Sequence, residues 1–263
     1  MDDRTFTKLA EIIYNKSGIT LNQKKKALVE GRIAKRVREL NLSNHKEYLD
    51  FVTDRNNGDE IENLIDVIST NVTHFYRESS HFEILELELK KWAKSGKNRI
   101  RIWSAAASSG EEPYTISMVA SDALKEFNVD LRILATDISR PMLQKCVKAQ
   151  YTPKALEMLP TNYIRDYMIK VNNHYRVSDA IKGRVLFKRV NLSKPPFPMR
   201  GPMDVIFIRN VMIYFDNRVK QKLINEAYRL LKVGGILFVG HSENLTEITH
   251  KFKTVAPATY KKI

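Results

Sequence analysis

Apolar residues recur every three or four positions through the first 78 residues of the chain. This spacing places them along one face of a helix, which then has a side to bury. The pattern predicts four short helices, the first of which ends near Gly18, because glycine commonly follows the last turn of a helix. The apolar residues that mark the four helices are, in order, Phe6, Leu9 and Ile13; Val29, Ile33, Val37 and Leu40; Tyr48, Leu49 and Val52; and Ile61, Leu64, Ile65 and Ile68. We expect an all-α amino-terminal domain at residues 1–78.

Beyond residue 98 the pattern changes to short apolar runs, rich in β-branched residues, that alternate with helical stretches. Such alternation is typical of an α/β domain with a parallel sheet and crossover helices. We expect this domain at residues 98–263, after a linker helix within residues 79–97. The predicted strands are Arg101–Ser104, Leu131–Thr136, Val185–Val190, Asp204–Arg209 and Ile236–Gly240.

Two other segments of the α/β part carry clear signals. A helix is expected from 217 to about 232, with Asp216 as its N-cap and the pair Gly234 and Gly235 as its stop. Around residues 150–190 the alternation breaks down, and His174–Val177 and Gly183–Val190 look like short antiparallel strands. We therefore expect a small antiparallel β subdomain inserted there.

Positive charge is concentrated in the middle of the chain. The net charge is +14, and residues 139–200 carry 13 Lys and Arg against 3 Asp and Glu, whereas residues 1–78 carry 13 of each. A basic patch attracts nucleic acid, an anionic membrane or an acidic protein surface. It can also be a solvated face with no partner, and charge alone does not choose among these.

A second basic cluster lies on the second predicted helix. Residues 24–38 include seven basic residues and one acidic residue. Arg32, Lys35, Arg36 and Arg38 fall away from the apolar stripe of that helix. We expect them to form an exposed basic surface.

The composition also excludes several classes of protein. The six histidines show no metal-ligand spacing such as HExxH, so no metal centre is expected. The single cysteine, Cys146, excludes an intramolecular disulfide framework. No apolar run is long enough to span a bilayer, and the first residues, MDDRTF, are unlike a secretory signal. We expect a cytoplasmic protein that does not insert into a membrane.

The most informative segment runs from Ile100 to Met118, IRIWSAAASSGEEPYTISM. It reads as a strand, a turn of small residues, and a helix start with Pro113 in its first turn. Small side chains let a ligand approach the backbone closely, as in nucleotide-binding α/β proteins. Asp137 follows the next predicted strand, where an acidic residue can accept hydrogen bonds from ribose hydroxyls.

The ligand implied by this segment is an adenosyl compound that carries a positive charge. Gly110 is the only glycine of the turn, so the dinucleotide fingerprint is absent. Glu111 and Glu112 would repel a pyrophosphate but suit the sulfonium and ammonium of S-adenosylmethionine. The alternative is that both glutamates only stabilise the helix start through its dipole.

Other polar residues follow the predicted strands at the edge where α/β proteins bind ligands. They are Asp137, Asn191 and Asn210. An asparagine both donates and accepts hydrogen bonds, as adenine edges and amino-acid groups require. Each asparagine could equally be a turn residue.

Five motifs in this order resemble those of the chemotaxis receptor glutamate methyltransferases, the CheR family. They are TNVTHFYRE, SAAASSGEEPYT, TDIS, RNVMIYF and GHSENL, and they extend over most of the chain. The resemblance implies a class I, Rossmann-like S-adenosylmethionine-dependent methyltransferase domain with a small antiparallel β subdomain, preceded by an all-α domain. It also implies methylation of glutamate side chains on the cytoplasmic helices of methyl-accepting chemoreceptors, with S-adenosylhomocysteine as the other product.

Position by position, the resemblance implies a set of residues that bind the cofactor. They are Asn71, Thr73, Arg77, Glu112, Asp137, Asn191, Leu192, Asn210 and Val211. Arg77 can hold a carboxylate through two hydrogen bonds, and Glu112 can meet the ammonium of the cofactor. Without the resemblance, TNVTHFYRE would read as a linker that caps a helix.

Arg77 and Tyr214 are the expected catalytic residues, because they can orient the incoming glutamate. A glutamate is already ionised in the cytoplasm and needs no general base. Catalysis is then mainly positioning and exclusion of water. Tyr214 could nearly as well be a core residue. We expect docking onto acidic receptor helices through the basic residues Arg32, Lys35, Arg36 and Arg38.

Several relatives hold a receptor tail peptide on a glycine-rich hairpin of the β subdomain. The corresponding stretch here, residues 170–176, contains no glycine, so we expect a member that does not use this tether. Two rival functions stay open: a nucleic-acid methyltransferase that uses the basic insertion, and a non-catalytic S-adenosylmethionine-binding module. We expect a monomer that acts on chemoreceptors and not on nucleic acid.

Overall fold

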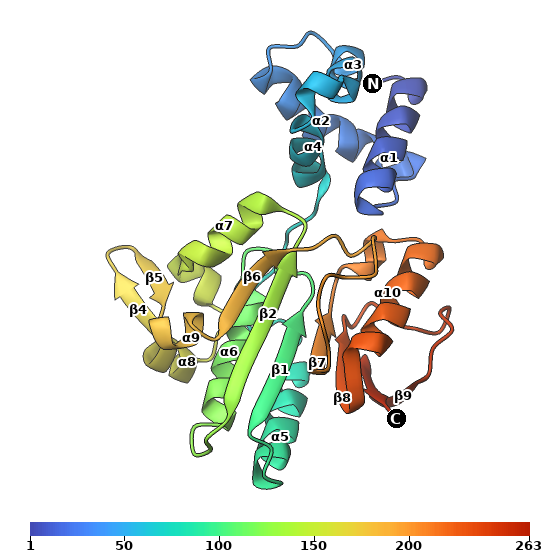
Figure 1. Ribbon diagram of the computed structural model, residues 1–263. Helices are drawn as coiled ribbons and strands as arrows, with labels where there is room; N and C mark the ends of the chain where they lie inside the picture. Colours follow the sequence, from blue (N-terminus) through green and yellow to red (C-terminus); the bar gives the residue numbers. More distant parts are fainter. The chain divides into compact units, whose positions relative to one another are not determined.

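The computed structural model describes residues 1–263, which form two compact units. The helical unit comprises residues 1–71 and 214–219. The α/β unit comprises residues 72–213 and 220–263. Each unit is described by itself below (Figure 1).

The helical unit confirms the four predicted helices. Its elements are α1 (Asp3–Ser17), η1 (Gln23–Lys25), α2 (Lys26–Glu39), α3 (His45–Thr53), η2 (Arg55–Asn57) and α4 (Glu60–Ile68). The side chain of Asp2 accepts from the main-chain N–H of Thr5 and begins α1, and Gly18 ends it in the left-handed conformation. The core contains Leu9, Ile33 and other residues of the four apolar stripes.

A short segment from late in the chain also belongs to the helical unit. Asp216 accepts a hydrogen bond of 2.7 Å from the hydroxyl of Tyr14. Phe215 forms an isolated antiparallel bridge with Ile19. Asp216 also accepts from the main-chain N–H of Val219 at 2.8 Å, as predicted for the N-cap of the following helix.

The α/β unit alternates helices and strands. Its elements are α5 (Ser80–Lys94), β1 (Arg99–Ser104), α6 (Glu111–Ala123), β2 (Asp130–Asp137), α7 (Arg140–Lys148), β3 (Gln150–Tyr151), η3 (Pro153–Leu156), α8 (Thr161–Tyr167), β4 (Met168–Val171), β5 (His174–Val177), α9 (Asp179–Lys182), β6 (Val185–Arg189), β7 (Met203–Ile208), η4 (Met212–Tyr214), α10 (Asn217–Leu230), β8 (Leu231–Val239), β9 (Phe252–Ala256) and β10 (Thr259–Lys262). The last residue of η4 and the start of α10 lie in segment 214–219, which belongs to the helical unit. All five predicted strands are present.

Seven strands form the main sheet, in the order β6-β2-β1-β7-β8-β10-β9. The first five are parallel, and β10 and β9 complete the sheet with antiparallel pairs. From β1 the chain order runs outward through β2 to β6 on one side and from β7 to β8 on the other. The carboxyl ends of β1 and β7 are therefore the switch point at which α/β sheets bind ligands.

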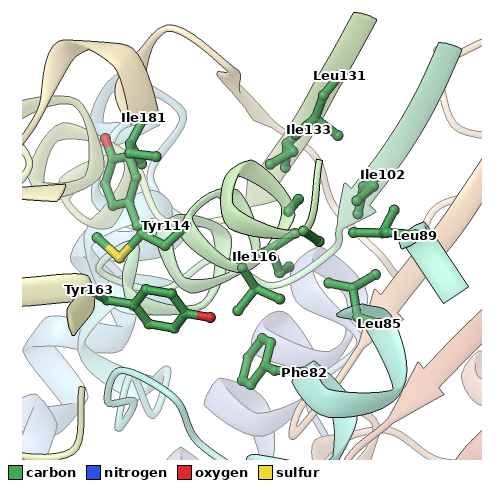
Figure 2. Close-up of a cluster of buried hydrophobic side chains, with 14 of the residues drawn as sticks. Phe82, Leu85, Leu89, Ile102, Tyr114, Ile116, Leu131, Ile133, Tyr163 and Ile181 are labelled. Atoms are coloured by element: carbon green, nitrogen blue, oxygen red, sulfur yellow. The ribbon is translucent and has the colours of Figure 1, made fainter. Parts of the chain in front are cut away.

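A hydrophobic core of the α/β unit lies between α5, α6 and one face of this sheet. Figure 2 shows Phe82, Leu85 and Leu89 of α5 near Ile116 of α6, with Ile102 of β1 beside them. All five side chains are at most 1% exposed. This packing fixes the amino-terminal end of α6, which carries the two glutamates of the small-residue turn.

Two predictions about these elements are wrong. Gly183–Val190 does not belong to an antiparallel subdomain: β6 pairs in parallel with β2 at the edge of the main sheet. The subdomain contains only β3, β5 and β4. A short apolar run shows that a strand forms but not which strand it joins, and Val185 and Phe187 here pack beside the main core.

The second wrong prediction concerns the end of the helix at 217–232. The helix α10 ends at Leu230, and Leu231 already begins β8 by pairing with Met203. Gly235 does not stop the helix. A Cβ at Gly235 would come within 2.9 Å of the carbonyl oxygen of Asp204, so glycine is needed for close approach of two strands.

No helix of this structure is both long enough and apolar enough to cross a lipid bilayer.

Candidate active site at the strand ends

The small-residue turn between β1 and α6 is packed from behind by larger side chains. Gly110 has φ 102°, and a Cβ there would lie 2.7 Å from the Tyr151 hydroxyl and 3.2 Å from Cys146 Sγ. The Tyr151 hydroxyl donates to the carbonyl of Ser109 at 2.9 Å, and the Cys146 thiol donates to that of Ser108 at 3.2 Å. Packing beneath the turn therefore requires glycine at 110.

Asp137, the last residue of β2, joins two loops through its carboxylate. It accepts from the main-chain N–H of Ser108 at 2.8 Å and of Ser139 at 2.9 Å. The carbonyl of Asp137 accepts from the N–H of Val190 at 3.1 Å. Asn191 comes next in the chain after Val190, so Asp137 and Asn191 lie at the carboxyl ends of the neighbouring strands β2 and β6.

Glu112 is the first of three charged groups buried at the switch point. It accepts from the Ser104 hydroxyl at 2.8 Å and from Nη1 of Arg209 at 3.0 Å. Burial raises the pKa of Glu112, against the opposing effects of Arg209 and Ser104. Burial also raises the pKa of Glu111, which accepts from the Ser109 hydroxyl at 2.7 Å. A carboxylate that acted only on the helix dipole would have its pKa lowered instead.

Arg209 is shared by two glutamates. Its Nη1 donates to Glu112, while Nη2 donates to the carboxylate of Glu78 at 3.1 Å and to the main-chain carbonyl of Arg77. The guanidinium also lies 5.4 Å from the ring centre of Phe82. One buried cation thus faces two carboxylates, which leaves one negative charge in excess when both are ionised.

Glu78 collects donors from both neighbouring strand ends. It accepts from Nδ2 of Asn210 and from the main-chain N–H of His241, both at 3.1 Å, in addition to Arg209. Burial acts to raise the pKa of Glu78, but Arg209 and the hydrogen bonds from Asn210 and Arg209 outweigh it and lower the pKa.

His81 lies beside Glu78 in the interior. Neither of its ring nitrogens makes a hydrogen bond, and burial lowers its pKa to about 3. The ligand atoms of Glu78, His81 and His241 lie within 4.8 Å of one another, as a metal site would need. Because the Glu78 carboxylate already accepts from three donors, we interpret this group as a polar cluster in which only His81 is fully buried.

Glu243 fixes the loop that follows β7. Its carboxylate accepts main-chain N–H donors from Asn210 at 2.8 Å, Met212 at 2.7 Å, Ile213 at 3.3 Å and Gly240 at 2.7 Å. Burial nevertheless raises the pKa of Glu243, against these hydrogen bonds. The loop conformation therefore depends on one side chain.

The segment before α5 is anchored to the α/β unit. Phe75 is fully buried, and the N–H of Tyr76 donates to the hydroxyl of Thr115 at 3.2 Å. Arg77 is half-buried, and its Nη1 donates to the carbonyl of Val72 at 3.0 Å. These anchors place Arg77 beside the buried charges, because its carbonyl binds Arg209.

Thr73 lines a hollow of about 390 Å³. The residues that line the hollow are Thr73, His74, Glu111, Lys154, Ala155, Glu157 and Met158.

The remaining predicted binding residues are placed as follows. Leu192 is buried, Val211 is half-buried, and Oδ1 of Asn191 accepts from the N–H of Ser193 at 3.0 Å. Asn71 and Tyr214 belong to the helical unit. The structure thus brings Glu112, Arg77 and Asn210 together around Arg209.

Comparison with known proteins decides what this arrangement belongs to. Residues 71–261 match the family model described as CheR methyltransferase, SAM binding domain. Residues 4–69 match the model described as CheR methyltransferase, all-alpha domain. The chain belongs to the CheR methyltransferase family. It is an S-adenosylmethionine-dependent methyltransferase of chemotaxis.

Named relatives are similar over nearly the full chain. A chemotaxis protein methyltransferase of Borreliella burgdorferi is 37% identical, with 97% of this chain and 93% of that protein covered. The chemotaxis protein methyltransferase of Salmonella typhimurium is 33% identical, with 99% and 90% covered. That of Escherichia coli is also 33% identical, with 99% and 91% covered.

The basic surface predicted on α2 of this CheR family member is only partly exposed. The Arg36 side chain is 16% exposed and binds Glu60, and Arg32 donates to the carbonyl of Ser69 at 3.2 Å. The prediction of exposure is therefore wrong for Arg36 and Arg32. Lys35 and Arg38 are exposed. The helical pattern placed these residues away from the apolar stripe of α2, but it could not show that the two ends of α4 pair with Arg36 and Arg32.

Sequence reasoning missed the residues that hold the CheR site together. They are Glu78, Arg209 and Glu243. Arg209 donates to Glu78, and Glu243 accepts from the main-chain N–H of Asn210, the residue after Arg209. Each lies within a motif that carried the resemblance: TNVTHFYRE, RNVMIYF and GHSENL. For Arg209 the available signal was a charged residue directly after an apolar strand, because such a charge is buried and needs a partner.

Proposed function

We propose that this methyltransferase transfers the methyl group of S-adenosylmethionine to glutamate side chains on the cytoplasmic helices of chemoreceptors. The observation that carries the proposal is the pair of largely buried glutamates, Glu112 and Glu78, on the single guanidinium of Arg209. Their excess negative charge suits a cationic donor and disfavours a phosphate ligand.

The predicted residues have distinct roles in this proposal. Asp137 binds the ribose, and Glu112 and Asn210 bind the amino-acid end of the donor. Asn191, Leu192 and Val211 contact the adenosine, while Asn71 and Thr73 complete the donor site. Support comes from the positions of Asp137 and Asn210 at the carboxyl ends of β2 and β7, where α/β proteins bind ligands.

The reaction forms a bond between a glutamate oxygen and the methyl carbon as the bond between that carbon and sulfur breaks. The glutamate attacks as a carboxylate, so no proton is transferred and the products are a methyl ester and S-adenosylhomocysteine. Arg77 and Tyr214 orient the incoming carboxylate. Because two opposite charges disappear, exclusion of water favours the reaction.

The acceptor is recognised by charge in this proposal. Lys35 and Arg38 of α2 remain exposed and can meet acidic receptor helices in the cytoplasm, in encounters steered by electrostatic attraction. The hairpin of β4 and β5 contains no glycine in residues 170–176. We therefore propose that the enzyme does not bind a tail peptide of the receptor. A titration with such a peptide that gave micromolar affinity would contradict this.

The experiment that tests the function uses methyl-labelled S-adenosylmethionine and membranes that contain chemoreceptors. We expect label in the receptors and its release as methanol in mild alkali, because a glutamyl ester is labile to base. Label that stays in nucleic acid after alkali would favour a nucleic-acid methyltransferase. Tight donor binding without any transfer would favour a non-catalytic module. Asp137→Ala serves as the inactive control.

A further inference from the structure

Glu78 connects the carboxyl ends of two neighbouring strands. One carboxylate oxygen accepts from Nδ2 of Asn210 at 3.1 Å. The other accepts from Nη2 of Arg209 and from the main-chain N–H of His241, both at 3.1 Å. Asn210 follows β7 and His241 follows β8. A single side chain therefore fixes both strand ends relative to the loop before α5.

The backbone around Glu78 is held in an unusual conformation. Glu78, Tyr76 and Asn210 are non-glycine residues at φ 58°, 58° and 57°. Side chains disfavour this left-handed region, and residues stay there only when surrounding contacts require it. Such strain gathers at sites where the position of a group matters.

The contact with Glu78 sets the orientation of the Asn210 amide. A carboxylate accepts hydrogen bonds only, so it binds the amide nitrogen and turns the amide oxygen away from itself. The main-chain N–H of Asn210 donates to Glu243 at 2.8 Å, which holds the residue from a second side. The amide oxygen of Asn210 accepts no hydrogen bond from the chain. The Asn210 amide oxygen is therefore already oriented to accept a hydrogen bond from a ligand.

We propose that Glu78 is a positioning residue that presents the Asn210 amide oxygen to the methyl donor. This selects a ligand with a hydrogen-bonding cation, and the ammonium group of S-adenosylmethionine donates only. The inference rests on the proposed function, because it assumes that Asn210 contacts the amino-acid end of the donor.

Binding of two related ligands tests this selection by calorimetry. S-adenosylhomocysteine has the ammonium group, whereas 5′-methylthioadenosine has the same adenosine and thioether without the amino acid. In Glu78→Gln, the introduced amide donates to Asn210, which must then turn its own amide nitrogen toward the ligand. We expect about tenfold weaker binding of S-adenosylhomocysteine or more, and a change of no more than about twofold for 5′-methylthioadenosine.

A double substitution gives the decisive result. Asn210→Asp alone places two carboxylates together and weakens binding of S-adenosylhomocysteine. Combined with Glu78→Gln, the introduced aspartate accepts from the glutamine and again presents an oxygen. We expect the double variant to bind S-adenosylhomocysteine better than either single variant. Binding no better than in both single variants would overturn the proposal.

Controls separate positioning from folding. Glu83→Gln removes an equal charge at an exposed position of α5 and should change neither affinity. If Glu78→Gln weakened both ligands equally, Glu78 would be only a structural residue and the proposal would fail. If the unaltered protein bound no S-adenosylhomocysteine, the proposed function itself would fail, which is a different result.

Discussion

Each unit of this protein buries an arginine on a glutamate, but the two clusters differ in how their charges balance. In the helical unit, Arg36 donates to both oxygens of Glu60, at 2.8 and 2.6 Å. Tyr48 and Asn63 complete the coordination of Glu60 at 2.8 and 2.9 Å. Burial acts to raise the pKa of Glu60, yet these partners lower it.

The cluster of the α/β unit is not balanced in this way. Arg209 divides its donors among Glu112, Glu78 and a carbonyl, and the pKa of Glu112 is raised by burial. The carboxylate of Glu60 is fully paired with Arg36 and needs no ligand. Glu112 and Glu78 share one arginine, so one of the two carboxylates has no cation of its own. The comparison teaches that incomplete neutralisation, and not burial of charge alone, indicates the ligand site.

The largest effect is expected from Arg209→Met, which leaves Glu112 and Glu78 together without a counterion. We predict that the free energy of unfolding of the α/β unit falls by about 3–5 kcal/mol. Both tryptophans, Trp92 and Trp103, lie in this unit, so fluorescence in a urea titration reports it. The matched control is Arg165→Met, which breaks an exposed pair with Asp166 in the same unit and should leave the free energy of unfolding nearly unchanged.

Arg36→Met is expected to cost less, because Tyr48 and Asn63 still bind Glu60. We predict a loss of about 2 kcal/mol in the helical unit, followed by far-ultraviolet circular dichroism. Binding of S-adenosylhomocysteine should not change. A large loss of ligand affinity would mean that the two clusters do not have the separate roles assigned here. Arg38→Met is the exposed control.

Glu112→Gln should separate binding from stability. The introduced amide can still accept from Arg209 and donate to Ser104, so folding is retained. We predict about tenfold weaker binding of S-adenosylhomocysteine, which corresponds to about 1.4 kcal/mol. Unchanged affinity in calorimetry would remove Glu112 from the donor site.

Glu112 and Glu60 should contribute to the free energy of unfolding with opposite dependence on pH. The pKa of Glu112 is raised above the ordinary 4.5, so its contribution to stability is lost as pH rises from 4.5 through the folded-state pKa. The pKa of Glu60 is lowered, so its contribution is present above 4.5 and is lost as pH falls through the folded-state pKa. Relative to the unaltered protein, Glu112→Gln should gain stability as pH rises above 4.5. Glu60→Gln should be less stable than the unaltered protein above pH 4.5, and this difference should shrink as pH falls below 4.5. Both slopes should stay below about 1.4 kcal/mol per pH unit. Parallel curves in thermal melts would contradict the comparison.

The smallest effect is expected on the exposed face of α2. Reversing Lys35 and Arg38 to glutamate should lower the rate of receptor methylation about threefold at low salt, because only encounter with the acceptor changes. Arg36 is unsuitable for this test, since its reversal would disrupt the pair with Glu60. A parallel loss of donor affinity would exclude a docking role for the two exposed residues.

Much of the fold could be predicted from sequence because periodic patterns report burial directly. The helices marked by residues such as Leu9 and Ile33, and the strands at the switch point, follow from spacing alone. The position of β6 could not be predicted, since an apolar run does not reveal its partner strand. Arg36 and Glu60 look like surface charges in sequence and are joined only by tertiary packing. Likewise Arg209 reveals its importance only once Glu78 and Glu112 converge on it.

The Cys146 thiol lies beneath the small-residue turn, so its rate of chemical modification can report local opening of the turn. Cys146 is fully buried, and its Sγ contacts the carbonyl of Ser108. Burial also raises its pKa, so a thiol reagent reacts only when the turn lifts. The rate of alkylation therefore measures how often this turn separates from α7. A ligand that binds against the turn should lower this rate.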